Sequence, residues 1–243
     1  MKRHLLIFGF LCIGYSAGAQ VLISLLFGDK LNSPNIEFGL DGGVNYANIA
    51  HVEPSKYLPI FNLGFYFDIR IKGPLLLHTG VIVKSSQGAG SLDPYLLNNP
   101  TLDTAFASGY VNRKVNYFHV PILIKYRFAT FFHVEAGPML ALRAKGYDEF
   151  LNKVKDKNDL SYKLDIKDNY KRIDAGIMVG AGSKLSRRPK SSQMGIRYYY
   201  GFVDPLKDNT GKAQYFSSIY VYFSIPIGVH DAESKDAKEE KVP

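Results

Sequence analysis

The chain has 243 residues, of which 46% are hydrophobic and 14% aromatic, with no Trp and a formal net charge of +8. This length fits one domain or two small ones, and the apolar content excludes a disordered chain. After the N-terminal segment no stretch of about 18 apolar residues occurs, so we expect no helical membrane span. The single cysteine excludes a disulfide scaffold and a cysteine-based zinc site.

Residues 1–19 have the features of a secretory signal peptide. Two basic residues begin the chain, Leu5 to Gly14 form a short apolar core, and small residues occupy positions 17 and 19. We expect cleavage after Ala19, which removes two positive charges and lowers the net charge from +8 to +6. Cys12 lies inside the apolar core and follows Leu11, where a lipoprotein signal has a small residue, so no lipid anchor is expected.

A short N-terminal segment, residues 20–35, follows the predicted signal. Its apolar run, Val21 to Phe27, is too short to span a bilayer. Two interpretations stay open for this run: a short helix at the membrane surface or against the end of the folded domain, and an ordinary apolar strand.

From Ile36 onward apolar residues alternate with polar or small ones, which predicts β-strands with two different faces. The clearest case is Phe61 to Ile71, where every second residue is apolar. No comparable helical periodicity occurs, so we expect an all-β chain. Eight strands are predicted: Ile36 to Ala47, Phe61 to Ile71, Leu75 to Lys84, Val111 to Phe128, Phe131 to Arg143, Lys171 to Leu185, Met194 to Phe202 and Tyr215 to Ile227.

The connections between these strands alternate mainly between short and long. Tight turns follow the second and fourth strands, whereas the third and fifth lead into long loops, Ser85 to Tyr110 and Ala144 to Tyr170. Outer-membrane barrels have short periplasmic turns and long external loops. We therefore predict an eight-stranded antiparallel up-and-down transmembrane β-barrel over residues 36–228. The charged, aperiodic residues 229–243 are predicted to form a disordered periplasmic tail.

Alternation alone does not decide which face points inward, because a soluble ligand-binding barrel is apolar inside and a membrane barrel is apolar outside. The second face favours the membrane barrel, since it carries glycines, such as Gly64 and Gly180, and charges of both signs. Small residues suit a narrow interior, and buried charges need partners. We predict an interior structural cluster of Asp68, Arg70, Lys125, Arg127, Glu135, Arg172, Asp174 and Arg197.

Several stretches resemble a known family. The signal ending Ala-Gly-Ala-Gln, the stretch from Phe118 to Phe128, Val134 to Pro138, and the glycine-containing strand from Arg172 to Gly182 resemble the PorT-like outer-membrane β-barrel proteins of Bacteroidota-type bacteria. The resemblance covers about Ile36 to Ile227 and implies an eight-stranded barrel in the outer membrane. Some members of that family are linked to type IX protein secretion and gliding, whereas most are known only as barrels. The chain departs from the usual barrel ending, because a charged tail follows the last strand.

The motifs that suggest chemistry are weak. Gly180 to Lys184 lacks the spacing and the helix of a phosphate-binding loop. His51-Val52-Glu53 and His133-Val134-Glu135 contain H-x-E, but the mature chain has no cysteine to complete a zinc deaminase site. A metal at His133 and Glu135 remains an alternative to a hydrogen-bonded interior. We expect no cofactor and no metal.

Three functions follow as expectations. The first is a non-enzymatic outer-membrane barrel with a structural or interaction role through its external loops, in contact with membrane lipid and with envelope or secretion proteins. The second is an accessory role in type IX-like secretion, which rests on the family resemblance. The third is a lipid-modifying enzyme, for which no converging Ser and His are found. Export argues against nucleic acid as a partner.

Overall fold

The computed structural model describes residues 31–154, 158–188, 190–208 and 212–227. The predicted signal peptide (1–19), the predicted tail (229–243) and the run Val21 to Phe27 lie outside the described residues, as do residues 20–30 of the predicted N-terminal segment. None of the helices in the described part is long and apolar enough to cross a membrane.

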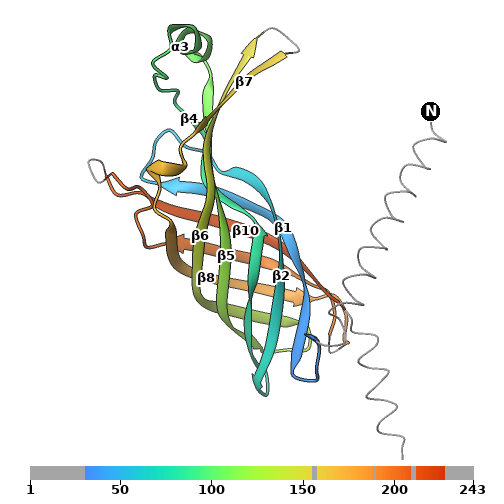
Figure 1. Ribbon diagram of the computed structural model, residues 1–243. Coiled ribbons are helices and arrows are strands. Elements are labelled where there is room, and N and C mark those ends of the chain that lie inside the picture. The colour runs from blue at the N-terminus through green and yellow to red at the C-terminus, as the bar shows by residue number, and fades with distance from the viewer. Residues whose placement is uncertain (1–30, 155–157, 189, 209–211, 228–243) are drawn as a thin grey trace, which may run out of the picture.

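Eight antiparallel strands form a closed ring (Figure 1). The ring runs in the order β1-β2-β3-β5-β6-β8-β9-β10, and pairing of β10 with β1 and of β5 with β6 closes it. Because the ring is closed, the edge of every ring strand is paired, as the hydrocarbon of a bilayer requires. The ring strands are β1 (Ile36–Ala50), β2 (Leu58–Lys72), β3 (Leu75–Lys84), β5 (Tyr110–Arg127), β6 (Phe132–Val154), β8 (Ile173–Lys184), β9 (Gln193–Gly201) and β10 (Tyr215–Pro226).

The eight predicted strands correspond to the eight ring strands, and the predicted barrel is confirmed. The connections 73–74, 128–131 and the described parts of the connection between β8 and β9 (185–188 and 190–192) lie at one end, together with the start of β1 and the end of β10, where Gly39 pairs with Pro226. We call this the periplasmic end, following the rule that periplasmic turns are short. The long connections emerge at the opposite, external end.

The outer face of the ring is apolar. On β5, for example, Phe118, Ile122 and Ile124 are exposed, whereas His119, Leu123 and Lys125, which follow them in turn, are buried. A soluble barrel has the reverse arrangement, so the alternation belongs to a membrane barrel. Exposed Phe, Ile, Leu, Val and Met side chains come from seven of the eight ring strands, all but β1: Phe61, Leu63, Ile71, Val83, Phe118, Ile122, Ile124, Phe132, Val134, Leu140, Leu142, Ile173, Ile177, Val179, Met194, Ile196, Val221, Phe223 and Ile225.

The two long loops of the sequence-based prediction contain regular structure, which corrects that prediction. The first includes β4 (Ser86–Leu92) and α3 (Pro100–Phe106), and the second includes the end of β6, β7 (Asn158–Asp165) and a single 3-10 turn, η3 (Lys167–Asn169). β4 shows no apolar alternation because both of its faces are buried. The alternation in β7, with an apolar residue at 160, 162 and 164, was present in the sequence but short.

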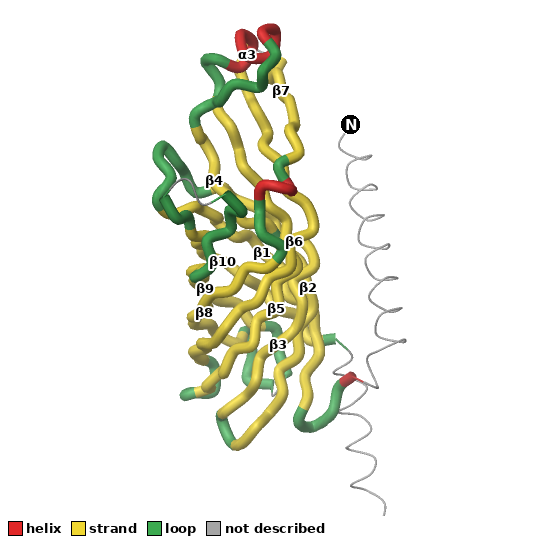
Figure 2. The backbone as a smooth tube through the Cα atoms, turned by 60° about the vertical axis from the view of Figure 1, so that its left-hand side comes forward, coloured by secondary structure: helices red, strands yellow, loops and turns green. Residues whose placement is uncertain are grey.

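Beyond the ring, the strands β5 and β6 continue outward and carry a separate structure, which we call the external arm (Figures 1 and 2). It consists of residues 110–116 of β5, residues 144–154 of β6, strand β7 paired with β6, and the segment 93–109 with α3. Asn99 begins α3, since its side chain accepts hydrogen bonds from the backbone N–H groups of Thr101 and Leu102. The arm is thus built by secondary structure rather than by irregular loops.

The β1–β10 seam predicts a sensitive position at Gly43. A Cβ atom there would collide with the backbone carbonyl of Val221 on β10, whereas a Cβ atom on Gly42 would make an ordinary 3.4 Å contact with Leu63. We expect Gly43→Ala to lower the free energy of unfolding by about 1–3 kcal/mol, the usual cost of overpacking. Gly42→Ala is the matched control and should change it by less than about 0.5 kcal/mol.

The free energy of unfolding of both variants is measured by urea titration of the refolded barrel. At each urea concentration, the folded fraction is read from the faster-migrating band of unboiled samples on a denaturing gel. Equal stability of the two variants would contradict the close approach of β1 and β10.

Candidate functional site

The half of the barrel interior nearer the periplasmic end is filled by ion pairs centred on Arg197 of β9. Its Nε donates to Oε1 of Glu135 on β6 (2.5 Å), and its Nη1 donates to Oδ2 of Asp41 on β1 (2.6 Å). The guanidinium carbon also lies 3.7 Å from the ring centroid of Tyr222 on β10. Arg197 is 2% exposed. One side chain therefore connects four strands of the ring across the lumen.

A second group of charges lies next to the first. Lys125 Nζ donates to both carboxylate oxygens of Asp68, at 2.9 and 3.1 Å, and lies 3.7 Å from Glu135. Nδ1 of His78 lies 2.6 Å from Oδ1 of Asp68, and Arg127 reaches the same carboxylate at 3.4 Å. Because Lys125 touches both acids, the two groups form one continuous network across the barrel. Such pairing is what makes burying these charges tolerable.

Glycine makes room for this network. A Cβ atom on Gly180 would lie 2.8 Å from Cγ of Arg197 and 3.3 Å from Cγ of Glu135. The small residues that the sequence places on the inner face thus face the stems of the large charged ones.

The structure places the predicted interior cluster as follows. It brings together Asp68, Lys125, Arg127, Glu135 and Arg197. Asp174 is buried but lies apart from them, nearer the external end, where it accepts a hydrogen bond from the Tyr199 hydroxyl (2.7 Å).

Two members of that prediction are wrong, because Arg70 and Arg172 are exposed. Arg70 lies at the periplasmic end of β2, where the register with β3 shifts. Arg172 precedes the first residue of β8 and so is not held by the inward alternation of a strand. The residues that the prediction left out of the cluster include Glu37, Asp41 and His78, which are buried at alternate, inward positions of β1 and β3. Parity along the strand was therefore the signal that would have found them.

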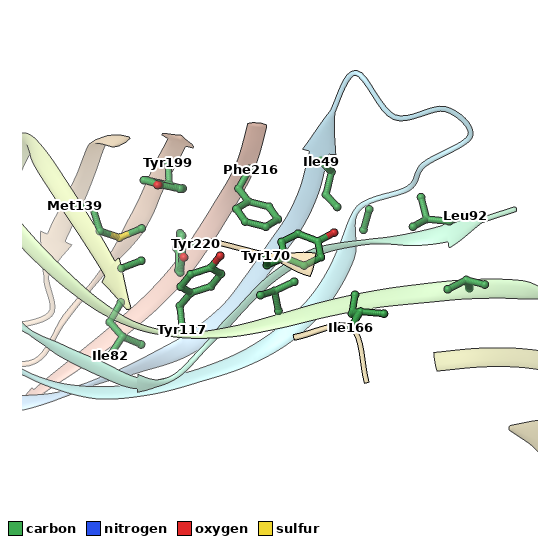
Figure 3. Close-up of a cluster of buried hydrophobic side chains, with 14 of the residues drawn as sticks. Ile49, Ile82, Leu92, Tyr117, Met139, Ile166, Tyr170, Tyr199, Phe216 and Tyr220 are labelled. Carbon is green, nitrogen blue, oxygen red and sulfur yellow. The ribbon is translucent and has the colours of Figure 1, made fainter. Parts of the chain in front are cut away.

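Aromatic side chains fill the half of the lumen nearer the external end (Figure 3). Tyr117 of β5 packs edge-on against Phe216 of β10 (5.9 Å between ring centroids). Tyr170 also contacts Phe216, in a stacked arrangement with 6.2 Å between ring centroids. Gln87 of β4 reaches into this layer, where it donates to the Tyr220 hydroxyl (3.0 Å) and accepts from Ser218 (2.5 Å). The lumen is thus closed at two levels, one ionic and one aromatic.

The external arm has a polar outer face. Lys114 of β5 and Lys163 of β7 both bind Glu149 of β6, at 3.2 and 3.3 Å, and both ammonium groups lie over the ring of Tyr147. Burial by itself would raise the pKa of Glu149, but the two lysines outweigh it and lower that pKa below its usual value. This ladder joins the three strands on the side of the arm that faces water.

The inner face of the arm is held by one strong ion pair and an aromatic cluster. Arg113 of β5 donates to both oxygens of Asp148 on β6, Nε at 2.8 Å and Nη2 at 2.6 Å, and the Tyr95 hydroxyl donates to the same carboxylate (2.9 Å). Phe150 packs edge-on against Tyr95 (5.0 Å) and Phe106 of α3 (5.9 Å). Bidentate pairing fixes the guanidinium plane.

A pocket of about 270 Å³ opens where the inner face of the arm meets the mouth of the barrel. Burial, reinforced by Asp148, raises the pKa of Tyr95, and burial raises the pKa of Tyr170 to about 12, so both hydroxyls keep their protons to a higher pH than an ordinary tyrosine does. The lining residues are Tyr95, Arg113, Ile166, Asn169, Tyr170 and Leu206.

The described residues contain no group of three or more His, Cys, Asp or Glu side chains placed to hold a metal ion. In the H-x-E stretch of β6, Nε2 of His133 lies 2.9 Å from the Tyr222 hydroxyl, and Glu135 pairs with Arg197. These contacts belong to a hydrogen-bonded interior.

A closed ring with an apolar outer face and an ion-paired lumen defines an integral outer-membrane barrel protein. A model of the outer membrane protein beta-barrel domain family matches residues 28–206, more than half of the chain. The chain belongs to this family, and its location is the outer membrane. A search of curated proteins finds no match.

Solved structures with a similar fold include three small outer-membrane proteins. Ail of Yersinia pestis, in complex with the heparin analogue sucrose octasulfate, is 9% identical with a TM-score of 0.42, over 79% of this chain and 99% of that chain. Neisserial surface protein A (NspA) is 10% identical with a TM-score of 0.38, over 78% and 96%. OprG of Pseudomonas aeruginosa is 8% identical with a TM-score of 0.37, over 79% and 91%.

The ion network predicts that Arg197 is needed for stability. Replacing it by Met leaves Glu135 and Asp41 buried without their main cation, and we expect a loss of about 3–5 kcal/mol in the free energy of unfolding. Arg70→Met, the same change on the exposed side chain, should cost less than about 0.5 kcal/mol.

Urea titration of both variants in the same detergent measures the difference. A double variant, Arg197→Met with Glu135→Gln, should recover part of the loss because one uncompensated charge is removed. If Arg197→Met is as stable as the unchanged protein, the claim that the ion network stabilises the ring is wrong.

Proposed function

We propose that this protein is a non-conducting outer-membrane barrel that presents its external arm as a docking surface for another envelope macromolecule. The observation that carries the proposal is the combination of a closed lumen with a structured arm. An ion network and an aromatic layer fill the interior from Asp68 up to Phe216, so the barrel is built to anchor rather than to conduct.

The arm supports the docking role because ion pairs join its strands and because it projects beyond the ring of strands (Figure 2). Binding sites are commonly carried by surface segments held on a rigid scaffold. On the arm, Leu96 is 75% exposed, and Tyr110 and Leu160 are also exposed. The arm therefore exposes both apolar side chains and the charged ladder, which are the two components of a protein-binding surface.

The same proposal assigns no catalytic reaction to the chain. His78, His119 and His133 are each 0–1% exposed inside the filled lumen, where a substrate from the membrane or from outside does not reach them. A histidine in this position stabilises the interior rather than acting as a general base on an external substrate.

The resemblance to the PorT-like barrels favours a more specific version, in which the docked partner belongs to a type IX-like secretion system. Secretion measured in a strain that lacks this protein tests that version. Unchanged secretion would remove it and leave the docking role itself in place.

The closed lumen predicts low conductance. In planar bilayers the purified protein should show no stable channel, because the network around Arg197 and the ring of Tyr117 occupy the path. Liposome swelling with small sugars should match protein-free liposomes. A stable, uniform channel would refute the non-conducting role.

The docking role predicts a partner at the arm in living cells. A photo-crosslinking amino acid at Leu96 or Leu160 should give a discrete higher-mass product, because these side chains leave the arm. The same residue at Ile124, which faces lipid on β5, is the matched control and should give no such product.

Absence of a discrete product from both arm positions, with normal surface levels of the protein, would contradict the docking role.

A further inference from the structure

We propose that the pocket between the external arm and the barrel mouth binds a small, neutral, largely apolar molecule that carries one hydrogen-bond-accepting oxygen. The inference goes beyond the docking role, since the pocket lies on the inner face of the arm and the docking residues Leu96 and Leu160 do not line it.

The size and the walls of the pocket indicate an apolar ligand of roughly one ring. Its volume of about 270 Å³ exceeds a cavity of about 150 Å³ that accepts benzene and lies just below the range of common ligand pockets. Ile166 and Leu206 form apolar walls, and Tyr95 and Tyr170 add aromatic faces. An apolar ligand that covers these walls gains binding free energy, because it removes apolar surface from water.

The elements that form the pocket are tied to one another, so the pocket exists before a ligand arrives. Tyr170 and Leu206 form a backbone bridge, and the backbone N–H of Lys207 donates to the carbonyl of Asn169 (2.9 Å). Arg113 is held by two hydrogen bonds to Asp148. A preformed site saves the cost of ordering its parts on binding.

Two donors supply the polar recognition. Arg113 lines the pocket with 19% of its side chain exposed, and its two bonds to Asp148 use Nε and Nη2. The Tyr170 hydroxyl lies beside Arg113 but is buried without a hydrogen bond of good geometry. Leaving a buried hydroxyl unsatisfied is unfavourable, and a ligand oxygen that accepts from these two groups corrects it.

The charge balance of the pocket selects a neutral ligand. Asp148 already compensates Arg113 at 2.6 Å. Tyr170 is neutral at pH 7, as tyrosines ordinarily are, and burial raises its pKa further, to about 12. A carboxylate in the pocket would lie near Asp148 without an unpaired cation to receive it. An alcohol, amide or ketone oxygen meets the donors without that repulsion.

Benzyl alcohol serves as the probe, with the full-length protein in lipid nanodiscs and its Ile and Leu methyl groups labelled for NMR. We expect saturable shifts of the Ile166 and Leu206 methyl signals, with half-saturation in the millimolar range or lower. Benzoate and ethylbenzene, which test the charge and the oxygen, should each bind at least about tenfold more weakly.

Two variants separate binding from folding. Leu206→Trp fills the pocket and should abolish the saturable shift of Ile166, while the unboiled gel shift shows that the barrel remains closed. Tyr170→Phe keeps the shape of the pocket and should weaken binding of benzyl alcohol about fivefold without lowering the urea midpoint, because it removes a hydroxyl that makes no good bond in the protein.

Several outcomes would overturn the proposal. Shifts that grow linearly without saturation, or equal Ile166 shifts in the Leu206→Trp variant, indicate partition into lipid. Tighter binding of benzoate refutes the neutral ligand class. The photo-crosslinks at Leu96 and Leu160 are measured independently, so failure of this site and failure of the docking role give different results.

Discussion

The contact of Arg197 with Glu135 and Asp41 in the centre of the barrel is the interaction on which the rest of the structure depends. An eight-stranded ring has an interior only wide enough for side chains, and membrane insertion directs the apolar side chains outward. The interior must therefore be filled by polar groups, which are stable there only if their charges are balanced. Arg197 balances two carboxylates at once, and Lys125 extends the balance to Asp68.

The dimensions of the ring follow from the same requirement. Glycines on the inner face make the space that the large charged residues occupy, as Gly180 does beside Arg197. At the β1–β10 seam, Gly43 permits the close approach of the two chain-terminal strands. The outer face needs no such precision, because lipid accommodates the exposed Phe, Ile, Leu and Val side chains of any shape. Specificity for this fold thus resides mainly inside the barrel.

The external arm obeys different physics because water surrounds it. Its outer face carries the Lys114–Glu149–Lys163 ladder, whereas its inner face buries Phe150 beneath α3. The same two strands, β5 and β6, are therefore apolar outside within the membrane and polar outside beyond it. This reversal marks the level at which the chain leaves the bilayer. It also explains why the pocket lies at the junction, where the aromatic layer of the lumen meets the covered face of the arm.

Alternation along the sequence determined the eight ring strands and the two faces of each, because a period of two follows directly from strand geometry. The glycines and the charges of both signs on one face then indicated that the apolar face points outward. The spacing between the strands gave the order of short and long connections. Alternation also placed Asp68, Lys125, Glu135 and Arg197 on the inner face. Tertiary structure alone decided which of these charges meet, since partners such as Arg197 and Asp41 lie 156 positions apart. It also decided that Arg70 and Arg172 are exposed, because side chains no longer alternate regularly between the two faces where a strand begins or ends. β4 and the pocket were hidden for the same reason: two buried faces leave no alternation, and the pocket walls come from segments distant in sequence.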